Sequence, residues 1–120
     1  MPNRKIILVV EDDPDTSDIL VMGLKAEGCS AFSQPNRDEA LAWIRQHGIP
    51  DVILLDWHMP GMEIGPFLTE LLKLGPPPRV VLMTAGQVAD EVAKTAGIPE
   101  VLRKPFLPTD LLEQIDGCHH

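Results

Sequence analysis

Apolar residues occur along this chain in short unbroken runs, each of which ends in polar residues at a turn. The runs cover residues 6–10, 53–55, 80–83 and, more briefly, 101–102. Runs of strand length without polar alternation are typical of strands covered on both faces, as in a parallel sheet flanked by helices. Residues 29–33 are half polar, which predicts a strand at the edge of that sheet.

The segments between these runs have apolar positions at helical spacing and residues that begin or end helices. The expected helices run from Pro14 to a stop at Gly28, from Asn36 to Gly48, from near Gly65 to residues 75–78, through Val88 to Gly97, and onward from Pro108. Asn36 followed three residues later by Glu39 resembles a capping box, which predicts a helix start. The residues expected to face the core are Ile19, Leu20, Met22, Leu24, Ala26, Ala40, Leu41, Ile44, Phe67, Leu68, Leu71, Leu72, Val88, Val92, Ala93, Ala96, Leu111, Leu112 and Ile115.

Five strands that alternate with five helices predict an α/β fold with a doubly wound, five-stranded parallel sheet. Parallel neighbours need a crossover connection, which is usually a helix and nearly always right-handed. The chain has 120 residues, the size of one ordinary domain. We therefore expect a single domain over residues 1–120, with an ordered core from about residue 4 to about residue 116.

Charge and cysteine content narrow the range of partners and compartments. Carboxylates outnumber Lys and Arg 18 to 10, and the formal net charge of −8 argues against direct nucleic-acid binding and favours a cationic or metal-bearing partner. The chain has neither a secretory signal nor an apolar run of the roughly 18 residues that a membrane span needs, which predicts a cytoplasmic protein. Cys29 and Cys118 lack metal-site spacing, so we expect free thiols without a role in a reducing compartment.

Polar side chains stand at the ends of four predicted strands, where parallel sheets bind ligands. They are Glu11 and Asp12, Asp56, Thr84 and Lys104. Carboxylates held together either rise in pKa or are neutralised by a divalent cation, and oxygen ligands that leave room for a phosphate favour Mg²⁺. Lys104 adds a mobile positive charge, and Thr84 adds a hydroxyl donor. The set predicts phosphoryl transfer to Asp56, because a positioned carboxylate can act as the nucleophile.

The segments that carry these residues resemble the motifs of the response-regulator receiver domain, the phosphorylatable module of two-component signalling in the CheY-like superfamily. They are Val-Val-Glu-Asp-Asp-Pro at 9–14, Leu-Asp-Trp-His-Met-Pro-Gly at 55–61, Met-Thr-Ala at 83–85 and Lys-Pro-Phe at 104–106. The resemblance covers essentially the whole chain. It implies a flavodoxin-like (βα)5 fold with strand order 2-1-3-4-5.

The resemblance also implies a role for each site residue. Asp56 would be the phosphoacceptor, and Thr84 and Lys104 would contact the phosphoryl group. Glu11 is the first member of the acidic pair at the metal site. Asp12 and Asp56, with the backbone carbonyl of His58, would hold Mg²⁺. A protein of this kind is a signalling phosphoacceptor rather than an enzyme, because it catalyses only its own phosphorylation and slow dephosphorylation.

The partners that the resemblance implies are proteins. A histidine kinase or a histidine phosphotransfer protein would donate the phosphoryl group. The phosphorylated domain would bind a downstream protein or a second copy of itself through the fourth helix, the fifth strand and the fifth helix. Neither nucleic acid nor a membrane would bind this chain directly.

The resemblance implies a cis Lys104–Pro105 bond, and it is imperfect in three places. Residues 63–64 stand where one acidic residue usually precedes Gly65, so the third helix is expected to start late or to kink. The segment of the fourth helix is slightly short, so that helix is expected to be abbreviated. Val101 occupies a position that is often aromatic, which predicts an unusual signalling face.

Other classes of protein fit the residues less well. A phosphatase or phosphotransferase of the haloacid dehalogenase type also has an aspartate nucleophile, but it needs a second aspartate where this chain has His58. A dinucleotide-binding domain would carry Gly-x-Gly-x-x-Gly after the first strand. A receiver-like interaction module that signals without phosphorylation stays an alternative, although such a module would lack one or more site residues.

Overall fold

The structure of the protein is a computed structural model that describes residues 4–59, 61–85, 98 and 100–119. The strands within these residues are β1 (Ile6–Val10), β2 (Ser30–Gln34), β3 (Val52–Asp56), β4 (Arg79–Thr84) and β5 (Glu100–Arg103). The helices are α1 (Pro14–Ala26), α2 (Arg37–His47), α3 (Ile64–Leu74) and α5 (Pro108–Gln114). The helix expected to end at Gly97 lies outside the described residues. None of the helices described is long and apolar enough to cross a membrane.

The strands form one parallel sheet in the order β2-β1-β3-β4-β5, with β2 at one edge as expected. The predicted doubly wound α/β fold is therefore confirmed. Val10 of β1 pairs with Leu55 of β3, and Asp56 pairs with Met83 of β4. This register brings the carboxyl ends of the three central strands to the same edge of the sheet.

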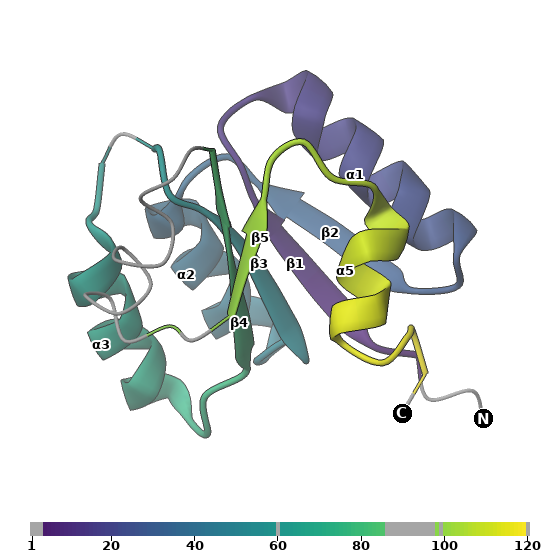
Figure 1. The fold of residues 1–120 in the computed structure, drawn as a ribbon. Coiled ribbons are helices and arrows are strands. Elements are labelled where there is room, and N and C mark those ends of the chain that lie inside the picture. The colour runs from purple at the N-terminus through teal and green to yellow at the C-terminus, as the bar shows by residue number, and fades with distance from the viewer. Residues whose placement is uncertain (1–3, 60, 86–97, 99, 120) are drawn as a thin grey trace.

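Helices cover both faces of the sheet, α1 and α5 on one and α2 and α3 on the other (Figure 1). Successive strand residues point to opposite faces, so each unbroken apolar run supplies both layers. In β1, for example, Ile7 and Val9 join the α1/α5 layer, whereas Leu8 and Val10 join the α2/α3 layer. The prediction of strands buried on both sides is confirmed for β1, β3 and β4, whereas β5, at the edge of the sheet, is only half-buried.

Two helices present their apolar residues differently from the expectation. Leu20 and Leu24 of α1 are buried, whereas Ile19 and Met22 are 66% and 70% exposed. The exposed residues expected to face the core are Ile19, Met22, Ala26 and Leu72. Residues 19, 22 and 26 recur at intervals of three and four, so they form a face of their own, which is turned away from the sheet. An apolar residue on a helix is thus not by itself a core residue.

Most of the predicted helix boundaries are confirmed. The side chain of Asn36 caps α2 by accepting a hydrogen bond from the backbone N–H of Glu39 at 2.8 Å. Gly48 follows α2 with a φ of 98°, in the left-handed region that favours glycine. α3 begins at Ile64, one residue before Gly65, which agrees with the predicted start near Gly65.

Cys29 and Cys118 form a disulfide across 89 residues of sequence, so the prediction of free thiols is wrong. The fold brings the residue before β2 and the segment after α5 to the same corner, near the start of β1. There the backbone N–H of Lys5 donates to the carbonyl oxygen of Cys118 at 2.7 Å, and Arg4 forms a β-bridge with His119. The first and last residues that the structure describes therefore lie side by side at this corner (Figure 1).

Candidate functional site

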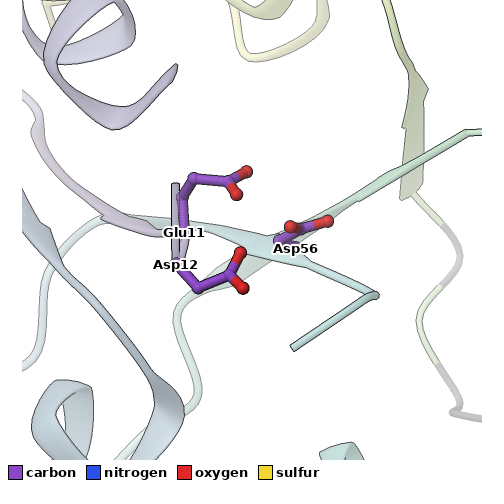
Figure 2. A group of neighbouring side chains, drawn as sticks. All are labelled: Glu11, Asp12 and Asp56. Carbon is purple, nitrogen blue, oxygen red and sulfur yellow. The ribbon is translucent and has the colours of Figure 1, made fainter. Parts of the chain in front are cut away.

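Three carboxylates meet at the carboxyl edge of the sheet. Glu11 and Asp12 follow β1 directly, and Asp56 is the last residue of the neighbouring strand β3. One oxygen from each carboxylate lies within 4.8 Å of the others. Figure 2 shows the three side chains directed into the same space. Glu11 and Asp56 are only 3% and 2% exposed, whereas Asp12 is open to solvent.

This cluster has the chemistry of a site for a hard divalent cation. Three negative charges this close repel one another, and burial of two of them in a low-dielectric environment strengthens the repulsion. Carboxylate oxygens are the ligands that Mg²⁺ prefers, and the exposed position of Asp12 leaves one side open for water or a phosphate oxygen. The residues present therefore fit magnesium.

Lys104 supplies the positive charge of the site from the end of β5. Its Nζ donates to Oε2 of Glu11 at 3.1 Å and to Oδ1 of Asp56 at 3.2 Å. Burial favours the neutral amine, but attraction to Asp56 and the hydrogen bond to Glu11 outweigh it and raise the pKa of Lys104. The lysine is thus charged at neutral pH and bridges the two buried carboxylates.

The pKa of the Glu11 carboxylate is clearly shifted. Burial raises its pKa from 4.5 to about 7, and the neighbouring Asp56 acts in the same direction. Hydrogen bonds from the backbone N–H of Asp13 and from Lys104 oppose this rise without cancelling it. A cation bound between the carboxylates would favour the ionised form of Glu11 instead.

Thr84 ends β4 beside Asp56, and its side chain is fully buried. Its hydroxyl makes a long contact, 3.4 Å, with the carbonyl oxygen of Ala85. The backbone ladder continues past the strand ends, because the N–H of Trp57 donates to the carbonyl oxygen of Met83 and the N–H of Lys104 donates to that of Thr84. The four strand ends named in the sequence therefore meet at one edge.

The loop after β3 borders the same site. The side chain of His58 is exposed, and with Trp57 and Glu63 it lines a surface cavity of about 570 Å³. Position 60 and residues 86–97 lie outside the described residues. The Lys104–Pro105 bond is cis, as the resemblance implied.

Arg37, the first residue of α2, was not among the predicted site residues. Its side chain is buried, and its guanidinium donates to the carbonyl oxygens of Asp56, Trp57 and Met62. A signal was present in the sequence: counting from Arg37, the buried apolar residues of α2 recur three, four and seven positions later. A charged residue on the buried face of a helix is unusual, so its position there indicates a specific contact.

The strand order and a polar site at the carboxyl edge define a flavodoxin-like α/β protein whose ligands bind at the point where the strand order reverses. Residues 7–116 match the family model of the response regulator receiver domain, so the chain belongs to that family. The predicted family and its fold are thus confirmed. Receiver domains of two-component systems act with histidine kinases and downstream effectors.

Individual relatives agree with the family assignment. The chain is 34% identical to an uncharacterised 14.6 kDa protein of Leptolyngbya boryana over 91% of this chain and 86% of that protein. It is 31% identical to the DNA-binding response regulator MtrA of Mycolicibacterium smegmatis over 93% of this chain, but spans only 49% of MtrA. A CheY-like receiver domain protein of Methanospirillum hungatei has a solved structure with a TM-score of 0.80 and 30% identity, covering 95% of this chain and 92% of that one.

Proposed function

We propose that Asp56 accepts a phosphoryl group, in a reaction that depends on Mg²⁺, from a histidine kinase or a histidine phosphotransfer protein. The observation that carries this proposal is the environment of Asp56. This residue is 2% exposed, its carboxylate accepts a hydrogen bond from Lys104, and it lies beside two further carboxylates. A nucleophile needs little further activation when the charge on the transferred group is neutralised and its geometry is fixed.

The step itself is an in-line displacement at phosphorus. An oxygen of Asp56 forms the new bond to phosphorus, while the bond from phosphorus to the donor histidine breaks and the histidine nitrogen keeps the electron pair. Lys104, which already bonds Asp56, would hold one phosphoryl oxygen, and Thr84 would donate its hydroxyl to another after turning from its long contact with Ala85.

Magnesium would be held by Asp12 and Asp56, with Glu11 beside them and the backbone carbonyl of His58 as a further ligand. When bound, it would neutralise the carboxylates and the oxygens of the transferred group. The close grouping of the three carboxylates supports this assignment, because like charges held together favour a bound cation. Burial is the main cause of the raised pKa of Glu11, and the neighbouring Asp56 adds to it.

We further propose that the whole of residues 1–120 works as one signalling domain in the cytoplasm and is not an enzyme acting on other substrates. Phosphorylation would alter a surface that includes β5 and α5 and so control binding of a downstream protein or a second copy. The DNA-binding function named for MtrA belongs to that protein, and the net charge of −8 argues against direct nucleic-acid binding by this chain.

Intact-mass spectrometry after incubation with acetyl phosphate tests the proposal. The unmodified sequence should gain the mass of one phosphoryl group with MgCl₂ and none with a chelator. Asp56→Asn should gain none under either condition. Asp51→Asn is the matched control, because Asp51 lies just before the same strand and its carboxylate accepts from the backbone N–H of Ile6 at 2.7 Å. Equal modification of Asp56→Asn, or modification without a divalent cation, would reject the assignment.

A further inference from the structure

Arg37 holds both ends of the loop that joins β3 to α3. Its Nη2 donates to the carbonyl oxygens of Asp56 at 2.9 Å and of Trp57 at 3.0 Å, where the loop leaves the strand. Its Nη1 donates to the carbonyl oxygen of Met62 at 2.7 Å, just before α3 begins. One rigid, planar guanidinium therefore fixes the separation of the two ends of the loop.

Burying this guanidinium is unfavourable by itself. Arg37 is only 4% exposed. Its Nε is buried and has no hydrogen-bond partner among the residues that the structure describes. Burial lowers the pKa of Arg37, while the charges of Asp56 and Glu63 act against that change. A buried charge is weak evidence for stability, because an apolar residue of similar size often serves as well. The three carbonyl bonds point instead to a role in the geometry of this loop.

The same loop contains the backbone carbonyl assigned above to the metal site. We infer that Arg37 is a positioning residue that orients the His58 carbonyl toward the cation at the Glu11, Asp12 and Asp56 cluster. This inference rests on the proposed function. Each peptide unit is planar, so fixing the carbonyls of Asp56 and Trp57 sets the two units before His58, and only the φ and ψ angles of His58 remain to direct its own carbonyl.

The restraint also acts from the far side of the loop. With Met62 held by the same guanidinium, the short segment between Trp57 and Met62 has both ends fixed to α2. Fewer loop conformations are then accessible before a cation arrives, so less conformational entropy is lost when it binds. Residues that orient metal ligands from behind typically contribute about 10- to 100-fold to metal affinity.

Two substitutions separate positioning from charge. Arg37→Gln removes the charge and leaves at most two amide donors, while Arg37→Lys keeps the charge but replaces the planar fork with a single ammonium group. Arg79→Gln is the matched control. Its guanidinium also bonds a backbone carbonyl, that of Gln114 at 2.7 Å, and a carboxylate, that of Glu100, but it stands at the start of β4 on the opposite edge of the sheet.

The measurement is the Mg²⁺ dissociation constant, read from the fluorescence of Trp57 in a Trp43→Phe background. Trp57 directly follows Asp56, so it reports on the site, whereas Trp43 lies on α2 against Phe32 and would add a background signal. Arg37→Gln and Arg37→Lys should both weaken Mg²⁺ binding by about tenfold or more. Arg79→Gln should stay within about twofold of the parent protein, the scatter expected without a positioning effect.

Hydrogen exchange without any metal gives a second, independent reading. Amides between Trp57 and Met62 should exchange faster in both Arg37 variants than in Arg79→Gln.

Retention of Mg²⁺ affinity by Arg37→Lys alone would show that charge matters and positioning does not, which overturns the inference. Unchanged affinity in both variants also overturns it. If Arg37→Gln shows no cooperative unfolding transition, it is not folded, and the Mg²⁺ affinity of Arg37→Lys alone then tests the inference. Failure of the parent protein to bind Mg²⁺ would instead reject the proposed metal site, and this inference with it.

Discussion

Raising the pH from about 5 to about 8 without divalent cations should destabilise the folded protein through Glu11. Burial raises the pKa of this carboxyl group from 4.5 to about 7 in the folded state. The unfolded chain loses the proton near pH 4.5, whereas the folded protein keeps it until about pH 7. The folded state therefore binds more protons within this window, and its stability falls as the pH rises through it.

The size of the effect follows from the separation of the two pKa values. At about 1.4 kcal/mol for each pH unit between them, the folded state should lose roughly 3 kcal/mol by the time the pH exceeds 7. Magnesium should reverse the trend, because it binds the ionised cluster and so stabilises the folded protein more as the pH rises.

Urea denaturation followed by circular dichroism in the presence of a chelator measures this loss at several pH values. Glu11→Gln keeps nearly the same shape but cannot ionise, so between about pH 5 and about pH 8 its stability should fall by roughly 2 to 3 kcal/mol less than that of the unmodified protein. Glu113→Gln, on the exposed face of α5, should behave like the unmodified protein. Parallel stability curves for the unmodified protein and Glu11→Gln would refute the reasoning.

Reducing the Cys29–Cys118 disulfide should lower the free energy of unfolding by about 4 to 5 kcal/mol, because the bond closes a long loop in the unfolded chain. Urea denaturation with and without dithiothreitol measures this loss of stability. If dithiothreitol destabilised Cys118→Ser, which has no disulfide, by a similar amount, the loss would not be due to the disulfide. The exposed side chain of His58, two residues beyond Asp56, should control how fast water removes a phosphoryl group from Asp56. His58→Ala and His58→Asn should therefore change the decay rate of phosphorylated protein followed by mass spectrometry, and decay at the original rate in both would show that His58 has no such role.

The sequence was sufficient to predict the sheet and its polar edge. Unbroken apolar runs such as residues 6–10 have only one common explanation in a chain of this size, namely strands with helices on both faces. Once the strands are parallel, the residues after them must share an edge, so the grouping of Glu11, Asp12 and Asp56 follows from connectivity alone. The unbroken apolar runs and the parallel connectivity were therefore enough to predict both features.

Contacts between distant segments were beyond the sequence. The disulfide joins residues 89 positions apart, and composition and spacing give no sign that the two cysteines meet. Ile19 and Met22 were assigned to the core because they are apolar, although burial depends on which face of α1 meets the sheet. The position of Arg37 in line with the buried residues of α2 indicated a specific contact, but not with what, because its partners are backbone carbonyls, which every residue has.

The central sheet keeps two sets of packed side chains apart. Leu20, Leu24 and Leu111 pack on one face, and Leu41 and Phe67 pack on the other, with strand residues alternating between the two. Substitutions that change volume in one layer are felt mainly by their own neighbours, so compensating changes are expected within a layer rather than across the sheet. The two halves of the molecule can therefore diverge at different rates during evolution. Side chains in the layer of α1 and α5 can change while α2 and α3 keep the packing around Arg37 intact.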